Sequence, residues 1–288
     1  MSGLDRLKQT ATETGADFSR RFQASFNAGI AWLKRRRRPS APPLLSRTER
    51  EQGLACMLFA LALACASALF VDVPAVGWAK ALPEWFVIAI NRWTDFGRSS
   101  YVLWPLGVLL LICIAVGAMR LPAIQHRVLA AVSVRVQFLF MAVALPGLFA
   151  TLVKYLVGRA RPLAPAVPDA LLFSPFGGGH GFSSMPSGHA VTAFSLLAAA
   201  GAMWPRAIPF LLVYAFSIAL SRVVVIAHFT SDVIVGALIG VCGAYLVRNA
   251  YAARGLVFHY DGRGRVVPKP GPSLRRLASL DRHIFEKH

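Results

Sequence analysis

The sequence predicts an all-α protein, a polytopic membrane bundle of six transmembrane helices with both termini in the cytoplasm. Hydrophobic residues make up 56% of the 288 residues and charged residues only 15%, and the mean hydropathy is +0.55. A chain this apolar lacks the polar residues that the surface of a soluble protein requires. Its apolar residues gather into runs, most of which approach the roughly 20 residues that cross a bilayer. The composition excludes disordered, collagen-like and disulfide-rich proteins.

Positive charge is concentrated at the two ends of the chain. Lys and Arg number 31 against 13 Asp and Glu, for a formal net charge of +18, and 20 of the 31 basic residues lie in residues 1–52 and 248–288. Because these segments flank the apolar part, we expect them to contact anionic lipids of the bilayer, and we expect no nucleic acid partner. The four cysteines lie in apolar runs, so neither disulfides nor metal binding is expected of them.

The first predicted region is a basic cytoplasmic arm over residues 1–52. Between residues 4 and 33, apolar residues recur at steps of three, four or seven, which predicts an amphipathic helix lying on the membrane surface. A solvated basic tail is the alternative interpretation. No cleavable signal peptide is expected, because the first 50 residues are polar and basic, so the first apolar run should act as an anchor.

The second predicted region, residues 53–247, carries the six spans. The fourth and fifth spans are separated only by Trp204-Pro205-Arg206, which predicts a tight turn. Residues 72–100 contain three tryptophans and are interpreted as an interfacial segment instead of a seventh span. Residues 248–288 form the third region, a basic and flexible cytoplasmic tail. The spans are expected at roughly 54–71, 101–119, 128–153, 187–205, 207–225 and 229–247.

The distribution of Lys and Arg among the connections predicts that both termini face the cytoplasm. This orientation leaves four basic residues at the outer ends of apolar helices, where a charge usually marks a functional site. One of them, Arg159, has two interpretations: it takes part in the functional site, or its role is structural and it extends to the lipid head groups. The other three belong to motifs that the topology brings to one face of the membrane. These motifs are Lys154-x6-Arg161-Pro162, Pro186-Ser187-Gly188-His189 and Ser221-Arg222-x5-His228-x3-Asp232.

The basic residues of these motifs favour the binding of a phosphate. Lys154, Arg161 and Arg222 supply three cations, and guanidinium groups match the oxygens of a phosphate monoester. Ser187 and Gly188 lie where the fourth span begins, so the free backbone N–H groups and the positive end of the helix dipole would face the same anion.

The histidines favour nucleophilic catalysis. His228 and Asp232 are four residues apart and share one face of a helix, so the carboxylate can orient the imidazole as a nucleophile. His189 would protonate the leaving oxygen as a general acid. The three cations supply the positive charge, so no metal cofactor is expected. A metal held by His228 and Asp232 is the alternative, but no third ligand of suitable type lies nearby in the sequence.

The three motifs, in this order and spacing, resemble the type-2 phosphatidic acid phosphatase superfamily, over roughly residues 140–250. The resemblance implies a membrane phosphatase that acts on lipid phosphates without a metal cofactor. It implies that His228 is the nucleophile, that Asp232 orients it and that His189 is the acid. The phosphate-binding residues that it implies are Lys154, Arg161, Arg222, Ser187 and Gly188.

The predicted function is the hydrolysis of a lipid phosphate or diphosphate through a phosphohistidine, at the periplasmic face of a bacterial inner membrane. The implied substrates are undecaprenyl diphosphate, phosphatidylglycerol phosphate, phosphatidic acid and the phosphates of lipid A, and no motif selects one of them. Phosphotransfer to another acceptor is the alternative. A lipid carrier or scramblase is less favoured, because the polar residues gather at one face. The loop 163–185 is interpreted as a cap that influences head-group choice, and its His180 as a surface residue. The oligomeric state is left open.

Overall fold

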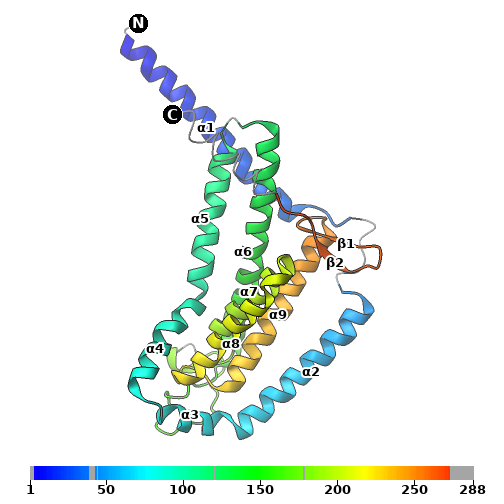
Figure 1. Cartoon of the computed structure of the whole chain (residues 1–288). Coiled ribbons are helices and arrows are strands. Elements are labelled where there is room, and N and C mark those ends of the chain that lie inside the picture. Colours follow the sequence, from blue (N-terminus) through cyan, green and yellow to red (C-terminus); the bar gives the residue numbers. More distant parts are fainter. Residues whose placement is uncertain (1–2, 39–42, 44, 120, 178, 273–288) are drawn as a thin grey trace. The chain divides into compact units, whose positions relative to one another are not determined.

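In the computed structural model the chain is predominantly helical (Figure 1). The structure describes residues 3–38, 43, 45–119, 121–177 and 179–272. The helices are α1 (Gly3–Lys34), α2 (Arg47–Phe70), α3 (Asp72–Lys80), α4 (Glu84–Thr94), α5 (Ser99–Gly117), α6 (Ala123–Val157), α7 (Gly188–Met203), α8 (Ile208–Val224) and α9 (Thr230–Ala253). Three short 3-10 helices, η1 (Asp95–Gly97), η2 (His180–Phe182) and η3 (Pro205–Ala207), and two strands, β1 (Phe258–Tyr260) and β2 (Val266–Pro268), complete the elements.

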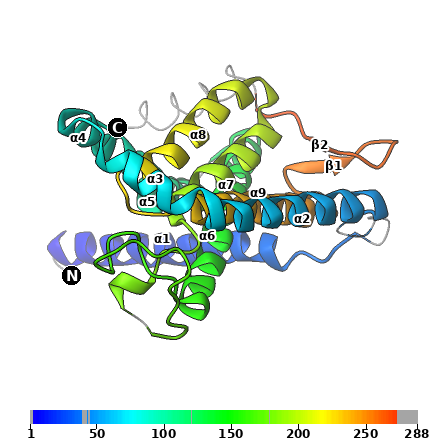
Figure 2. The same ribbon diagram turned by 90° about the horizontal axis from the view of Figure 1, so that it is seen from below.

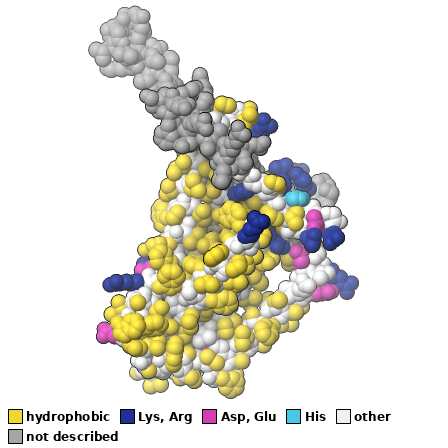
Figure 3. Space-filling view, viewed as in Figure 1, with side chains coloured by type: hydrophobic (Ala, Val, Ile, Leu, Met, Phe, Trp, Pro, Cys, Tyr) yellow, Lys and Arg dark blue, Asp and Glu magenta, His cyan; other side chains and the backbone are white. Residues whose placement is uncertain are grey.

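Within the described ranges, five helical stretches are long and apolar enough to cross a membrane: 47–70, 84–117, 123–157, 205–224 and 230–253. Helix α7 is also apolar but has only 16 residues. Hydrophobic side chains cover most of the helical face seen in Figure 3, and on α2 Leu58 and Phe59 are 57% and 72% exposed. Such a surface fits lipid, so a mostly helical integral membrane protein is confirmed, whereas the count of six spans and the side of each terminus stay predictions.

The chain divides into two compact units, of which the larger comprises residues 42–104 and 138–250. Its core lies where α7 packs against α8, with small residues such as Ala190 and Ala193 fully buried between them. Two glycines of α9 let that helix touch α7 directly. A Cβ atom added at Gly236 would come within 2.6 Å of the Ser187 carbonyl oxygen, and one added at Gly240 within 2.6 Å of the Val191 carbonyl oxygen. Small residues at such points allow close backbone packing in membrane helices.

The segment predicted to be interfacial forms α3 and α4, and both helices pack against α8 (Figures 1 and 2). Side chains fix this arrangement on two sides. The Trp93 indole donates to Ser217 Oγ at 3.1 Å, and the Tyr214 hydroxyl donates to the Phe96 carbonyl at 2.8 Å. The end of α4 is thereby held beside the C-terminal half of α8, which also carries Arg222.

The smaller unit comprises residues 1–41, 105–137 and 251–288. Helix α1 covers the range in which the sequence predicts an amphipathic helix, and its binding to a membrane stays a prediction. Between residues 251 and 272 the C-terminal tail contains regular structure, which differs from the expectation of a flexible segment, and the rest of the predicted tail, residues 273–288, lies outside the described residues. Strands β1 and β2 pair as a hairpin, and Leu256, Val257 and Phe258 before and within it are buried. Burial of this apolar run explains why these residues are ordered.

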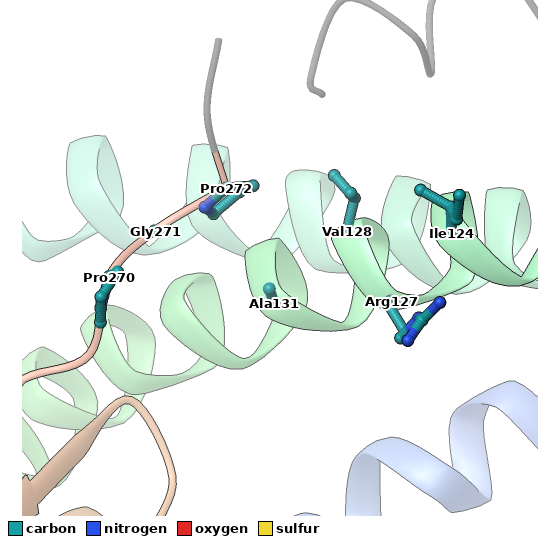
Figure 4. Close-up of a pocket in the computed structure, with 7 residues that line it drawn as sticks. All are labelled: Ile124, Arg127, Val128, Ala131, Pro270, Gly271 and Pro272. Carbon is teal, nitrogen blue, oxygen red and sulfur yellow. The ribbon is translucent and has the colours of Figure 1, made fainter. Parts of the chain in front are cut away.

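The tail is also attached to α6 inside the smaller unit. The Arg135 guanidinium donates to the carbonyl oxygens of Lys269 and Pro270, at 3.0 and 2.9 Å. A cavity of about 380 Å³ lies between α6 and the residues that follow β2 (Figure 4). It is lined by Ile124, Arg127, Val128, Ala131, Pro270, Gly271 and Pro272.

Candidate active site

The three motifs meet at one place in the larger unit, where α6 ends, α7 begins and α8 is followed by α9. Lys154, on α6, interacts electrostatically with Arg161, Arg222 and Asp232. His189, on the first turn of α7, interacts with His228 and with Arg222. The structure therefore gathers the residues predicted from the sequence. They are Lys154, Arg161, Ser187, Gly188, His189, Arg222, His228 and Asp232.

The three cations of the site contact neutral groups. Lys154 Nζ donates to the Ser183 carbonyl at 2.9 Å, and Arg222 Nη1 donates to Thr94 Oγ1 at 2.8 Å. The Nε atoms of Arg161 and Arg222 are buried and have no hydrogen-bond partner among the described residues. No carboxylate of the described residues forms an ion pair with Lys154, Arg161 or Arg222. Buried positive charge of this kind is unfavourable unless an anion binds to it.

The start of α7 offers further donors. Ser187 precedes the helix and is fully buried, and within the described chain its Oγ has no hydrogen-bond partner. Gly188 follows it, and a Cβ atom added there would meet no atom within 4 Å. The backbone at Gly188 thus borders open space at the positive end of a helix dipole, which is a common place for an anion.

His228 lies in the turn between α8 and α9 and is only 4% exposed. Burial lowers the pKa of its imidazole from 6.5 to about 4, an effect that the negative charge of Asp232 partly opposes. The imidazole is therefore neutral, with a lone pair available, across the neutral pH range. Its Nδ1 atom lies 3.8 Å from Asp232 Oδ2, which is longer than a hydrogen bond.

Asp232 is completely buried and accepts three hydrogen bonds. Arg159 Nη1 donates to Oδ1 at 2.5 Å. Ser184 Oγ and the Phe229 backbone N–H donate to Oδ2, at 2.5 and 2.9 Å. These donors stabilise the ionised carboxylate and fix its orientation, so Oδ2 faces the His228 ring.

The sequence analysis missed several contributors to the site. Thr94 accepts from both Arg222 Nη1 and Ser221 Oγ at 2.8 Å, and Gly97 packs against His189, since an added Cβ would lie 3.0 Å from the imidazole Cδ2. No sequence signal marks these two residues. Asp72 could have been found, because it is an acidic residue directly after an apolar run, where an ionisable group is a functional hypothesis.

The structure decides between the two interpretations of Arg159. It is 1% exposed and forms ion pairs with Asp72 and Asp232, so the interpretation in which it extends to lipid head groups is wrong. The loop 163–185 returns to the same region, since the Ser184 N–H donates to the Arg159 carbonyl at 3.0 Å and the Arg161 N–H donates to the Gly181 carbonyl at 2.7 Å. Its effect on head-group choice stays a prediction.

Gly158 allows the chain after α6 to turn and to pass close to the backbone of Ser174. It follows α6 with φ of +56°, and a Cβ atom added there would lie 1.9 Å from the Ser174 carbonyl oxygen. We expect Gly158→Ala to destabilise the protein by at least about 2 kcal/mol, because the strained backbone and the overlap with Ser174 act together. Thermal unfolding of the solubilised protein measures this change.

The matched control is Gly147→Ala on α6, where an added Cβ meets no atom within 4 Å. This substitution should leave the unfolding temperature unchanged or raise it slightly, because alanine favours a helix. Equal unfolding temperatures for the two variants would contradict the role given to Gly158.

The comparisons with known proteins agree on one family. The model of the PAP2 superfamily matches residues 135–256. Lipid A 1-phosphatase of Rhizobium johnstonii is 32% identical over 224 residues, which are 77% of this chain and 88% of that protein. Lipid A 1-phosphatase of Rhizobium etli is also 32% identical over 224 residues, 77% of this chain and 93% of that protein.

Two solved structures resemble the chain more distantly. The crystal structure of LpxE from Aquifex aeolicus is 23% identical and gives a TM-score of 0.45, with 62% of this chain and 94% of that chain covered. A transmembrane PAP2-type phosphatidylglycerolphosphate phosphatase from Bacillus subtilis is 21% identical and gives a TM-score of 0.48, with 68% and 93% covered.

Proposed function

The chain belongs to the PAP2 superfamily and is a membrane-bound phosphoric ester hydrolase that acts on lipid phosphates, and we propose that its substrate is the 1-phosphate of lipid A. The relatives named for this activity support the choice, because each is 32% identical and is matched over most of its length. Undecaprenyl diphosphate, phosphatidylglycerol phosphate and phosphatidic acid are the competing substrates. The proposed location is the bacterial inner membrane, with the site at its periplasmic face.

One observation carries the proposed chemistry. Lys154, Arg161 and Arg222 form no ion pair with a carboxylate of the described chain, and Lys154 and Arg222 both act electrostatically on the buried His228 and on His189, which directly follows the open space at Gly188. A phosphate in this space would accept hydrogen bonds from the orphaned guanidinium Nε atoms and from the start of α7. Its phosphorus would then lie within reach of the His228 ring.

In the first proposed step, His228 Nε2 attacks phosphorus while the ester P–O bond breaks. His189 donates a proton to the departing oxygen, and the product is a phosphohistidine. The Nδ1–H of His228 then faces Asp232, and we expect their 3.8 Å separation to shorten when the ring becomes positively charged. Lys154, Arg161 and Arg222 stabilise the negative charge on the phosphoryl oxygens during the transfer.

In the second proposed step, water attacks the phosphohistidine. His189, now neutral, removes a proton from the water, the N–P bond breaks, and inorganic phosphate leaves His228 as a neutral imidazole. We propose that no metal ion takes part, since protein cations provide the positive charge. The described residues contain no group of three His, Cys, Asp or Glu side chains able to hold a metal.

The test is phosphate release by the purified, solubilised protein from a panel of lipids in the presence of EDTA. The panel contains lipid A, lipid A lacking the 1-phosphate, phosphatidylglycerol phosphate, phosphatidic acid and undecaprenyl diphosphate. We expect release from lipid A, none from the form without the 1-phosphate, and rates at least about tenfold lower for the other lipids. A preference for another lipid would replace the proposed substrate and leave the chemistry intact, and inhibition by EDTA would contradict the metal-independent mechanism.

A further inference from the structure

Arg159 lies behind the catalytic pair and does not face the phosphate. Its side chain is 1% exposed, and its guanidinium lies over the Phe229 ring with Cζ 4.6 Å from the ring centroid. Nε and Nη2 both donate to the Ala170 carbonyl, at 2.9 and 2.8 Å. Nη1 donates to Ser231 Oγ at 2.6 Å as well as to Asp232. All nitrogens of the guanidinium are thus engaged inside the protein, and none is left for a substrate.

Asp72 occupies the other side of this guanidinium. Its Oδ2 accepts from Arg159 Nη2 at 2.8 Å and from Ser231 Oγ at 2.5 Å. Its Oδ1 accepts from Ser67 Oγ at 2.9 Å and from the Ser231 backbone N–H at 3.0 Å. The carboxylate is 0% exposed, so α3 contributes a fully buried and fully bonded anion to the region behind His228.

The charges of this buried group have a direct consequence for His228. Arg159 carries one positive charge, and Asp72 and Asp232 each carry one negative charge, so the group has a net charge of −1. With Arg159 and Asp232 alone the net charge would be zero, and the field at the imidazole would be weak. Asp72 therefore gives the group of Arg159, Asp72 and Asp232 one uncompensated negative charge, and Oδ2 of Asp232 in this group lies 3.8 Å from Nδ1 of the ring that becomes positive during the proposed reaction.

We propose that Asp72 and Arg159 are positioning residues of the reaction: Arg159 holds the Asp232 carboxylate toward His228, and Asp72 balances Arg159 so that Asp232 keeps its effective charge. This proposal rests on the proposed function, because it gives His228 the role of nucleophile. It assigns a function to α3, which the three sequence motifs do not include.

The experiment measures the acid limb of the pH profile of kcat/KM, which reports the protonation of the free nucleophile. Besides the proposed pair, the charged or titratable groups that act on His228 are Asp232 on α9, Lys154 on α6, Arg222 on α8 and His189 on α7. Asp72→Asn removes a negative charge behind the ring, so the imidazolium is less stable and the limb should move to lower pH, by about half to one pH unit. Arg159→Gln removes a positive charge, so the limb should move to higher pH by a similar amount.

Combining the two substitutions makes the test stricter. The double variant has the original net charge of −1, so its limb should return close to that of the unmodified protein, although kcat should stay about 10²-fold or more below it because Asp232 is no longer held. Protonation of the substrate is common to all variants and cancels in the comparison. A purely structural role for the pair predicts lower activity with no opposite displacement of the two limbs, and that result would overturn the proposal.

Glu49→Gln on α2 is the matched control for the removal of one carboxylate charge. Glu49 lies at the start of α2, contacts Arg248 at 3.5 Å, and belongs to a capping box that glutamine preserves. The acid limb of this variant should coincide with that of the unmodified protein. If Arg159→Gln does not fold, the acid limbs of Asp72→Asn and Glu49→Gln still decide the proposal. Both variants replace a carboxylate by an amide, but only Asp72 belongs to the buried group that contacts Asp232 through Arg159.

A second readout does not require a substrate. In protein labelled with ¹³C-histidine, the His228 resonance, assigned with His228→Ala, titrates with the pKa of the ring, and Asp72→Asn and Arg159→Gln should displace it in the same opposite directions. Displaced titrations without lipid hydrolysis would support the electrostatic pair while contradicting the proposed function. Lipid hydrolysis together with identical His228 titrations in all variants would support the proposed function and contradict the electrostatic role of the pair.

Discussion

Replacing His228 with alanine is expected to lower kcat by at least about 10⁴-fold, because the variant lacks the group that we propose forms the covalent bond to phosphorus. The protein should remain folded, since the change removes a buried ring that has no hydrogen bond through Nδ1 within the described chain. Phosphate release from the preferred lipid measures the loss, and thermal unfolding of the same preparation measures folding.

Two further variants make this result specific. His259→Ala replaces an exposed histidine on β1 and should have full activity. His189→Ala should lose hydrolysis of the lipid but still release p-nitrophenolate in a burst, because that leaving group needs no proton, and should accumulate the phosphohistidine. Turnover by His228→Ala would disprove the role of His228 as nucleophile. A burst of p-nitrophenolate from His228→Ala but not from His189→Ala would mean that His189 is the nucleophile and His228 the acid.

The second large effect is expected for Asp232→Asn, with a fall in kcat of about 10³–10⁴-fold. An amide cannot stabilise the imidazolium that forms when His228 bonds to phosphorus, and it can hold the ring in the wrong tautomer. KM should change little, because Asp232 faces His228 and Arg159 instead of the phosphate space. Steady-state kinetics separate the two parameters.

The structure adds a stability component to this prediction. Asp232 is 0% exposed and is one of two carboxylates on Arg159, so the amide leaves that guanidinium with a single anionic partner and should lower the unfolding temperature. Binding of a nonhydrolysed phosphate analogue separates the two consequences. A loss of analogue binding in a folded Asp232→Asn protein would mean that Asp232 shapes the phosphate site and does not assist His228.

Much of the site could be predicted because its residues lie in short motifs with fixed spacing. A spacing of four positions brings His228 and Asp232 close together, although α9 begins only at Thr230, and the helix that begins at Gly188 follows from the motif in front of it. The apolar runs likewise predict most of the helices, since a bilayer admits few other structures. Features that depend only on neighbouring residues in the chain can therefore be predicted from the sequence.

The remaining residues depend on contacts between distant segments. Asp72 precedes Arg159 by 87 positions, and Thr94 precedes Arg222 by 128. Arg159 turns inward to Asp72, Asp232 and the Ala170 carbonyl, and no periodicity in the chain reports the pairing with Asp72. The hairpin of β1 and β2 was missed for another reason: strands of three residues are too short to show alternation.

The two glycines of α9 have a mechanical consequence. No side chain separates Gly236 and Gly240 from the α7 backbone, and the Ser187 N–H donates to the Asp232 carbonyl at 3.0 Å. Helix α7, which begins at Gly188, and helix α9, which carries Asp232, are therefore in direct contact at these two positions, with no layer of side chains between them. Because this contact leaves no side chains to rearrange, we expect the separation between the start of α7 and Asp232 to change little when lipid-exposed helices such as α2 respond to a bilayer of different thickness.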